Sequence, residues 1–336
     1  MREGYMGTTI IDVAKICGFS KTTISRAFAS PELVSEKTRN IIYDAAQKVN
    51  YTPDAIARAM VMKKTSNIGF IVSDQQYPVV LNPFYSPVFE GVLQIGRERG
   101  YSVFIASERD IQLPTGQVYM KKQMDGVIIC GQTELRIIES FRAQNIPVVL
   151  LNNVFDLEQL VCVTVDHYGG AVKAVEHLIE RGNRDIAIIS GHFSPYVYHE
   201  RFRGYTDSLA KHDIPVRQEL IRTIEPTMEQ AMQCTQELLA LKNRPSAIFA
   251  TNDVIAIGAI KMALRSHYSI PQDLAIVGFD DSDFSAIIEP ELTTVRIEKE
   301  KIGKIAAGKL IDIIEHSAVE KQIIECETQL IQRETT

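Results

Sequence analysis

The sequence predicts a chain of two parts: a small all-α head with a helix-turn-helix, and a larger α/β body of two lobes with parallel sheets covered by helices. Three observations predict this. Capped helical segments occupy residues 8–50, strand-like and helical runs alternate from residue 67 onward, and the two parts differ in charge. The length of 336 residues allows two or three domains of ordinary size.

The overall net charge of −6 argues at first against a nucleic-acid-binding protein. Residues 1–64, however, hold ten Lys and Arg against six Asp and Glu, whereas the remaining residues hold 26 against 36. A basic head on an acidic body indicates that the head meets an anionic partner. Because the excess in the head is modest, chance remains an alternative on charge alone.

Each helical segment of the head follows a residue that can cap it. Thr9 precedes the first segment and Asp12 lies three positions further on, which is the spacing of a capping box. Ser20 and Ser35 precede the other two segments. The three predicted helices cover residues 10–17, 21–29 and 36–49.

The first two segments have the spacing of a helix-turn-helix, since only about three residues join them. Ala14 is small enough for a close helix crossing, and Gly18 can adopt a positive φ in the turn. Ile24 is the expected apolar contact from the second helix to the first. Any small helical bundle is the alternative interpretation.

The second helix of a helix-turn-helix enters the major groove with its N-terminal part. Lys21, Thr22 and Arg26 are therefore the predicted base readers, because Lys and Arg donate to guanine and Thr contacts thymine. Each of these residues could also be an ordinary surface residue, so the three together are stronger evidence for DNA binding than any one of them. The predicted phosphate contacts are Ser20, Thr23, Ser25, Thr38 and Arg39.

Residues 51–66 predict a linker that contains a short helix. Pro53 suits a first helical position, and a helix of about two turns is marginal on its own. Binding to DNA or to a second copy of the chain would be needed to stabilise this helix. Ala57 and Met60 are the linker residues expected at the DNA, with Met60 as a minor-groove wedge. Packing of Met60 on the body is the alternative.

The body alternates strand-like and helical runs, which predicts parallel sheets. So many strands suggest two sheets rather than one. The strand-like runs are 68–72, 102–105, 126–129, 148–151, 161–165, 185–189, 247–250 and 275–277. The helical runs are 84–99, 134–143, 168–181, 200–211, 227–242 and 253–266.

Polar residues that follow the predicted strands are candidate ligand contacts, because open α/β sheets bind ligands beyond the carboxyl ends of their strands. Carboxylates and amides there suit a ligand rich in hydroxyls. An N-cap is the alternative role, favoured for Asp166 and open for Asp280. The predicted ligand residues are Phe84 and Tyr85 as stacking rings, Asn152, Arg201, Asn252 and Asp280.

Several function classes lack their sequence signals. The chain has no dinucleotide, phosphate-loop, nucleophile-elbow or zinc-protease motif, so we expect neither an enzyme nor a cofactor. Its five cysteines are scattered without metal-like spacing, which indicates no metal site and reduced thiols in the cytoplasm. No apolar run could span a bilayer, and the N-terminus lacks a signal-peptide core.

A series of short motifs runs through both parts of the chain. The head carries IDVAKICGFSKTTISR, VSEKTR, YTPD, ARAM and TSNIG. The body continues with NPFY, MDGVI, IPVV, DHYGG, RFRGY, ATND, VGFDD and LTTV. With these motifs in this order, nearly the whole chain resembles the LacI/GalR family of bacterial transcription regulators.

This resemblance implies a body like the periplasmic sugar-binding proteins, with the ligand between two lobes. The chain would cross between lobes near residues 165, 295 and 325. The implied units are 8–50 for the helix-turn-helix, 51–66 for the hinge, 67–165 plus 296–325 for one lobe and 166–295 plus 326–336 for the other. It also implies a homodimer that reads a near-palindromic operator. The predicted DNA and ligand residues fall on the family's positions for those contacts.

Four departures from the family pattern bear on these expectations. Met60 replaces the usual Leu wedge, and Asp54 places a carboxylate near DNA. Pro226 stands where some members carry a pocket aromatic residue. Ile297 and Glu298 replace the common Gln-Pro, which puts a polar contact between the lobes in doubt.

We therefore expect a ligand-responsive repressor of transcription that binds a sugar or related metabolite. A purine or nucleoside remains an alternative ligand, given Phe84 and Tyr85. A solute-binding protein and a sugar-directed α/β enzyme are the competing classes. The basic head opposes the first, and the missing catalytic motifs oppose the second.

Overall fold

The structure, a computed structural model, describes residues 8–29, 31–52, 64–73, 79–111, 124–192, 196–316 and 320–336. The chain divides into two compact units. The head unit is Met1–Asn67 with Lys122–Asp125, and the body unit is Ile68–Lys121 with Gly126–Thr336.

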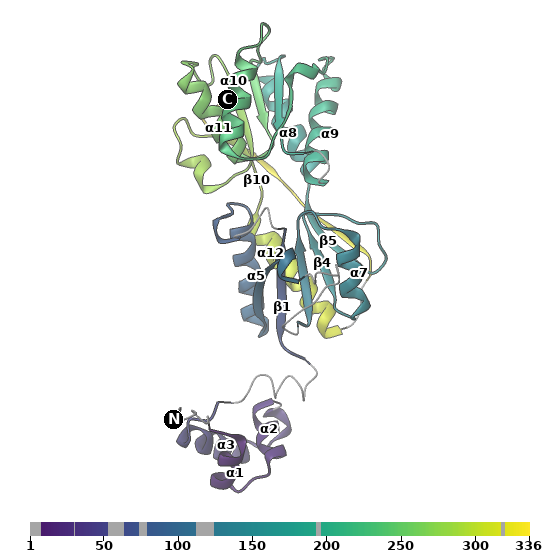
Figure 1. The fold of residues 1–336 in the computed structure, drawn as a ribbon, viewed down its shortest axis with the longest axis vertical. Coiled ribbons are helices and arrows are strands. Elements are labelled where there is room, and N and C mark those ends of the chain that lie inside the picture. The colour runs from purple at the N-terminus through teal and green to yellow at the C-terminus, as the bar shows by residue number, and fades with distance from the viewer. Residues whose placement is uncertain are drawn as a thin grey trace. The chain divides into compact units, whose positions relative to one another are not determined.

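The head unit contains the three predicted helices, α1 (Ile10–Cys17), α2 (Lys21–Ala29) and α3 (Glu36–Lys48), and a short 3-10 helix, η1 (Pro31–Leu33) (Figure 1). The predicted caps are present. The Asp12 carboxylate accepts hydrogen bonds from the Thr9 amide at 3.1 Å and hydroxyl at 2.8 Å, and Gly18 ends α1 with a φ of 73°. Local sequence signals therefore set the ends of these helices.

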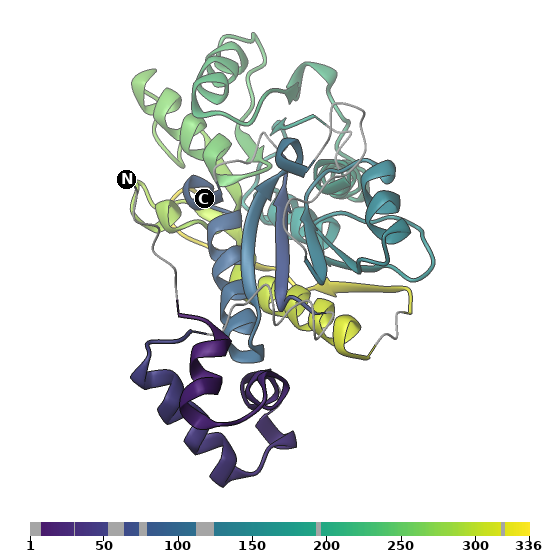
Figure 2. The ribbon, with the colours of Figure 1, turned by 60° about the horizontal axis from the view of Figure 1, so that its bottom comes forward.

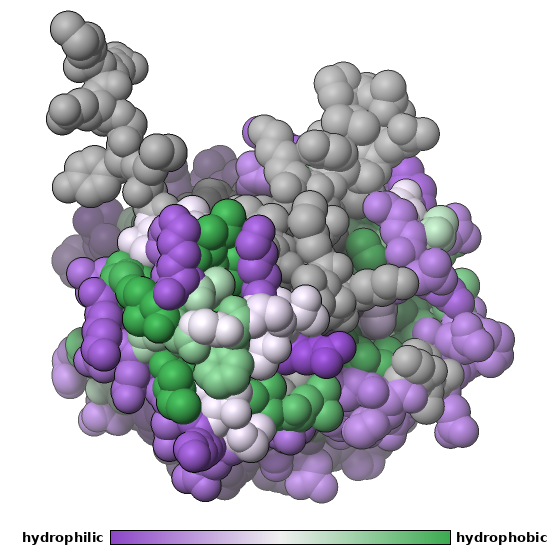
Figure 3. Space-filling model, turned by 90° about the horizontal axis from the view of Figure 1, so that it is seen from below, coloured by the Kyte–Doolittle hydropathy of each residue, from purple (hydrophilic) through white to green (hydrophobic). Residues whose placement is uncertain are grey.

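A compact apolar core joins the three helices of the head. Val13, Ile24 and Ile42 contribute one buried side chain from each helix. The Tyr43 hydroxyl donates to the Ala27 carbonyl at 2.8 Å, which ties α3 to α2. In a view of the molecule from below, apolar and polar side chains are intermixed on the coloured part of the surface (Figure 3).

The described part of the body has two sheets of six strands, one in each lobe (Figure 1). The strands of each sheet run parallel in the registered pairs, except that β12 is antiparallel to β10. The first sheet has the order β11 (Gln322–Cys326), β5 (Val161–Val165), β4 (Val148–Leu151), β3 (Gly126–Cys130), β1 (Asn67–Val72), β2 (Ser102–Ser107). The second has the order β12 (Gln329–Ile331), β10 (Thr293–Arg296), β9 (Ala275–Asp280), β8 (Ala247–Ala250), β6 (Ile186–Ser190), β7 (Ile221–Thr223).

Helices pack around both sheets (Figure 2). In the described residues no helix is long and apolar enough to cross a membrane. The first lobe contains α5 (Tyr85–Arg99), α6 (Glu108–Ile111), α7 (Leu135–Ala143), α12 (Lys299–His316) and the 3-10 helix η3 (Val79–Leu81). The second contains α8 (His167–Glu180), α9 (Tyr196–Lys211), α10 (Met228–Leu239), α11 (Asp253–Arg265) and the 3-10 helices η4 (Gln218–Leu220) and η5 (Asp283–Ala286).

The body chain passes between the two sheets at three places. It leaves the first sheet after Val165, returns after Arg296 and leaves again after Cys326. The Asp166 amide donates to the Cys326 carbonyl at 2.9 Å, so the first and third of these passages lie side by side. The polar residues that follow the strands of both sheets can therefore face the space between the two lobes.

Two glycines allow α5 and α12 to pack closely in the first lobe. A Cβ at Gly303 would stand 2.0 Å from the Val88 carbonyl oxygen, and one at Gly91 would stand 2.2 Å from that of Glu300. A real Cβ does not approach backbone this closely, so any side chain at either position would force the helices apart. Gly308, on the same helix α12, has no such neighbour.

We expect Gly303→Ala to lower the free energy of unfolding by about 2 kcal/mol, because it separates two packed helices. Gly308→Ala is the matched control and should raise it by roughly 0.5–1 kcal/mol through better helix propensity. Urea and thermal unfolding of the full chain would measure both. Equal effects of the two substitutions would contradict the close approach as the cause.

Candidate functional site

A cavity of about 880 Å³ is lined by residues of both lobes of the body. Its volume is that of a small-molecule site. The structure brings all six predicted ligand residues to its wall, and their contact with a ligand remains a prediction. Phe84, Tyr85 and Asn152 line it from the first lobe, and Arg201, Asn252 and Asp280 from the second.

The ends of parallel strands bring these residues together. Asn152 directly follows β4, Asn252 follows β8 after one residue, and Asp280 ends β9. Asn152 and Asp280 have positive φ values of 56° and 113°, so the backbone turns sharply at both. Non-glycine residues tolerate such conformations only where the surroundings fix them, and this is common at binding sites.

Arg201, on α9, carries the buried positive charge of the cavity wall, and its side chain is only 5% exposed. Its Nη2 lies 3.3 Å from Asp280 Oδ1, and its Nη1 donates to the Thr251 carbonyl. The guanidinium carbon lies 3.7 Å from the centre of the Phe279 ring. Burial raises the pKa of Asp280, while Arg201 and Lys299 oppose that rise.

Asn152 and Thr133 line the cavity from the first lobe. In the described residues, Asn152 Oδ1 and Thr133 Oγ1 are buried without a hydrogen-bond partner. A buried polar atom without a partner is costly. A ligand hydroxyl group that reached either atom would supply the missing hydrogen bond.

Asn252 has a structural role beside its predicted one. Its Oδ1 accepts from the Ile255 amide at 2.8 Å and so caps α11, which leaves its amide nitrogen for other partners. Tyr198 also lines the cavity, and sequence reasoning missed it. Asp166 accepts from the Gly169 amide at 2.6 Å, which confirms the preferred interpretation as an N-cap.

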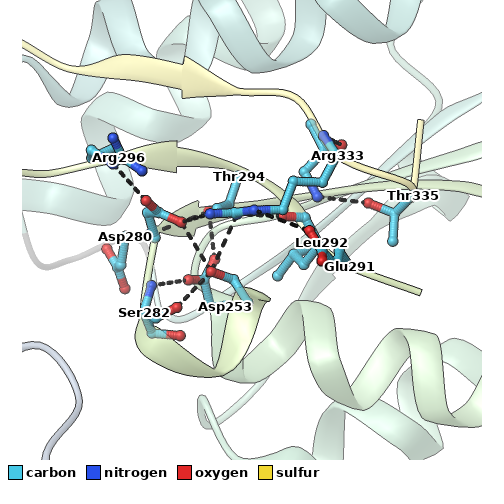
Figure 4. A network of polar contacts seen from close by, with 12 residues as sticks. Asp253, Asp280, Ser282, Glu291, Leu292, Thr294, Arg296, Arg333 and Thr335 are labelled. Carbon is cyan, nitrogen blue, oxygen red and sulfur yellow. Dashed lines mark hydrogen bonds and ion pairs between the residues drawn. The ribbon is translucent and has the colours of Figure 1, made fainter. Parts of the chain in front are cut away.

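A polar network fixes the loop that follows Asp280 (Figure 4). Asp281 accepts hydrogen bonds from Arg296 Nε at 2.6 Å and from Arg333 Nη2 at 2.7 Å. Lys299 Nζ donates to the carbonyls of Asp280 and Asp281 at 2.5 and 2.9 Å. Because Lys299 begins α12 of the first lobe, it forms a polar contact between the lobes.

Of the departures from the family pattern, Asp54 and Met60 lie outside the described residues, and the others lie in the body. Ile297 is buried among apolar side chains, and the next residue but one, Lys299, makes the polar contact between the lobes. Pro226 lines the cavity beside Glu225 and Thr227. Sequence reasoning missed Lys299, although its position directly after the altered Ile297–Glu298 pair was a signal.

On the head, the predicted base readers Lys21, Thr22 and Arg26 are all exposed on α2. The predicted phosphate contacts are more varied. Ser20 caps α2 by accepting from the Thr23 amide at 3.1 Å, and Ser25 is half-buried.

Two further phosphate candidates already have partners in the protein. The Ser35 hydroxyl donates to the Thr38 hydroxyl, and Arg39 Nη1 donates to the Pro31 carbonyl at 3.1 Å. The predicted linker contacts Ala57 and Met60 lie outside the described residues.

Both parts of the chain match known protein families. Residues 9–54 match the family described as bacterial regulatory proteins, lacI family, and residues 175–336 match a periplasmic binding protein-like domain. The chain is 32% identical to a probable HTH-type transcriptional repressor ExuR of Bacillus subtilis, across 97% of this chain and 98% of that protein. It is 31% identical to an HTH-type transcriptional repressor PurR of Actinobacillus pleuropneumoniae, across 97% of each.

The chain belongs to the LacI family of bacterial regulatory proteins. A solved complex of the transcriptional regulator CelR with cellobiose has 27% sequence identity and a TM-score of 0.74, and the match covers 98% of this chain and all of that one. The fold also resembles a Lac repressor dimer bound to operator, with a TM-score of 0.81 at 24% identity and coverage of 98% and 99%. This LacI-family chain is thus a helix-turn-helix regulator of transcription.

Beside the cavity, Asp253 is a buried carboxylate that accepts from the Ser282 amide and the Thr294 hydroxyl, both at 2.6 Å (Figure 4). Burial and the neighbouring Asp280 carboxylate raise the pKa of Asp253 to about 7. Its ionisation is therefore less favourable in the folded chain than in the unfolded one. This penalty is absent below about pH 4 and grows as the pH rises toward 7.

We compare the free energy of unfolding of Asp253→Asn with that of the unsubstituted chain at each pH. Between pH 4 and 8 the difference should shift in favour of Asp253→Asn by on the order of 2 kcal/mol, because Asn does not ionise. Asn can accept from the Ser282 amide and donate to Thr294. Unfolding at several pH values would measure the difference. The exposed Asp283→Asn is the control and should give no such trend; a flat difference for Asp253→Asn would contradict the raised pKa.

Proposed function

We propose that this LacI-family chain is a homodimeric repressor of transcription. We further propose that a neutral, hydroxyl-rich molecule of the sugar class binds in the cavity and shifts operator affinity. The observation that carries the ligand class is the polar lining of one cavity by both lobes: the Arg201–Asp280 pair lies on one side, and Asn152, whose Oδ1 has no partner within the described chain, lies on the other. Donors and acceptors on both walls suit hydroxyl groups, which can donate and accept.

The charges around the cavity favour an uncharged ligand. Among the described lining residues, carboxylates outnumber the positive charge of Arg201, which Asp280 already neutralises. An anionic sugar acid, sugar phosphate or nucleotide would need a cation that is not so engaged. The lining carboxylates are Glu108, Glu134, Glu225 and Asp280. The CelR–cellobiose complex and a LacI-family regulator from Enterococcus faecium with bound ribose support a sugar.

A nucleobase or nucleoside is the second candidate ligand. Phe84 and Tyr85 pack edge to face, with ring centroids 5.0 Å apart, and both line the cavity. Tyr85 is buried in the core of the lobe, so Phe84 is the ring better placed to stack on a base. The hydroxyl-directed polar set on both walls still favours the sugar.

The ligand would act by linkage. A molecule that prefers one arrangement of the two lobes shifts the operator affinity, and operator DNA shifts the ligand affinity by the same factor. In the head, we assign base reading to Lys21, Thr22 and Arg26. Phosphate contacts fall to Ser20, Thr23, Ser25, Thr38 and Arg39, and minor-groove contacts to Ala57 and Met60.

A thermal-shift screen of the full chain tests the ligand class, because a molecule that binds only the folded state raises the melting temperature. We expect neutral mono- and disaccharides to raise it, and their uronic acid and phosphate counterparts to have little effect. A rise with free nucleobases alone would favour the second candidate. A bound sugar recovered unchanged after incubation would argue against catalysis.

Arg26→Ala should abolish discrimination between operator and unrelated DNA, because the exposed Arg26 is a proposed base reader. We expect a loss of at least tenfold in the specificity ratio, measured by fluorescence anisotropy at fixed salt. Ligand affinity should not change. Lys48→Ala removes the same charge from the exposed end of α3 and should leave the specificity ratio intact.

Asp280→Ala should weaken sugar binding by at least tenfold, because it removes the carboxylate that faces Arg201 in the cavity. Operator binding without sugar should survive, since Lys299 holds the loop through backbone carbonyls rather than this carboxylate. Isothermal titration and anisotropy would measure the two affinities. Asp283→Ala, an exposed neighbour outside the cavity, is the control; a normal sugar isotherm for Asp280→Ala would refute the assignment.

A further inference from the structure

His167 is a buried histidine that lies behind the cavity wall rather than in it. It begins α8, directly after the first passage between the lobes, and is 1% exposed. Its Nδ1 lies 3.4 Å from Arg201 Nε and 3.2 Å from Arg201 Nη2. A side chain that bonds the cavity's buried cation can determine how that cation meets a ligand.

The contacts of Arg201 account for nearly all of its hydrogen-bonding capacity. A guanidinium has five N–H donors in a rigid plane. The Nε–H and one N–H of Nη2 point to His167. The other N–H of Nη2 points to Asp280, and one N–H of Nη1 points to the Thr251 carbonyl. Among the described residues, one N–H on Nη1 has no protein partner. The direction of this remaining donor depends on all the other contacts.

The contact with Arg201 also fixes the protonation state of His167. Arginine can only donate, so Nδ1 must accept, and the ring proton of a neutral imidazole then sits on Nε2. An imidazolium would offer no acceptor and would place a second positive charge beside Arg201. Burial and Arg201 together lower the pKa of His167 well below its usual value, which agrees with a neutral ring.

The aromatic rings that flank His167 cannot replace its Nδ1 as the hydrogen-bond acceptor for Arg201. The rings of Tyr196 on α9 and Phe279 on β9 lie 6.1 and 6.2 Å from the imidazole, centre to centre. The charged groups on this side are Arg201 itself and, through it, Asp280. Within the described chain, His167 Nε2 has no hydrogen-bond partner.

We propose that His167 is a positioning residue for Arg201: its neutral Nε2–H tautomer holds the guanidinium edge so that the spare Nη1 donor faces the cavity. Asp280 supplies charge from one side and His167 supplies an uncharged acceptor from the other. Without His167, Asp280 alone would direct Nη2 and Nε would lose its partner. The consequence for ligand binding rests on the proposed function, whereas the positioning itself does not.

Nitrogen-detected NMR of the full chain, without added ligand, tests the tautomer directly. We expect His167 to be in the Nε2–H form with unprotonated Nδ1 at neutral pH. In Arg201→Met, the Nδ1–H form should become populated at His167 only. His177, a second buried histidine that bonds the Thr336 hydroxyl, is the internal control and should not respond. An Nδ1–H or doubly protonated His167 in the unsubstituted chain would overturn the proposal.

Two substitutions then separate positioning from packing. His167→Phe keeps a ring between Tyr196 and Phe279 but removes the acceptor, whereas His167→Asn keeps an acceptor oxygen near the Nδ1 position. We expect the Arg201 Nε–H to exchange with solvent roughly tenfold faster in His167→Phe, as expected for one lost hydrogen bond. His167→Asn should restore slow exchange, and His177→Asn should have no effect. Unchanged exchange in His167→Phe would refute the proposal.

These readouts use no ligand, so they separate the two proposals. If the tautomer and exchange results are as expected but no sugar stabilises the chain, only the proposed ligand class fails. If sugars bind but Arg201 is indifferent to His167, only the positioning role fails. Should His167→Phe fail to fold, the tautomer in the unsubstituted chain still decides.

Discussion

The buried guanidinium of Arg201 is the constraint on which the rest of the cavity depends. A charge that is almost fully removed from water must be paired and hydrogen-bonded, or it destabilises the fold. Asp280, the Thr251 carbonyl, the Phe279 ring and His167 meet this need from four directions. Placing Asp280 there has its own cost, because its carboxylate makes ionisation of the neighbouring Asp253 less favourable.

The same constraint links the cavity to the passages between the lobes. Asp280 sits on a loop with positive φ values, and Asp281 next to it bonds Arg296 and Arg333. Arg296 ends the strand before the second passage, and Arg333 follows the strand after the third. Lys299 joins the same loop to the first lobe. A displacement of Asp280 would therefore act on residues beside two of the three passages.

Sequence alone predicted most of the head and the main residues of the cavity, because their signals are local. Caps at Thr9, Ser20 and Ser35 set the helix starts, and strand ends pointed to Asn152 and Asp280. Contacts between distant segments left no such signal: His167 appeared only within the DHYGG motif, just before the predicted helix 168–181. The alternating runs also missed α12, whose interior glycines weaken its helix propensity, and the short strands β7, β10, β11 and β12.

The capping hydroxyls of the head bear on how it can meet DNA. Ser20 and Ser35 already accept from the amides of Thr23 and Thr38, so their oxygens stabilise the helix starts. A helix N-terminus nevertheless keeps further N–H groups and a partial positive charge that favour phosphate. The capped ends can thus position the backbone of DNA, which leaves the exposed Lys21 and Arg26 to their proposed role as base readers. The acidic body adds no competing attraction, so the overall charge of −6 is compatible with a DNA-binding head.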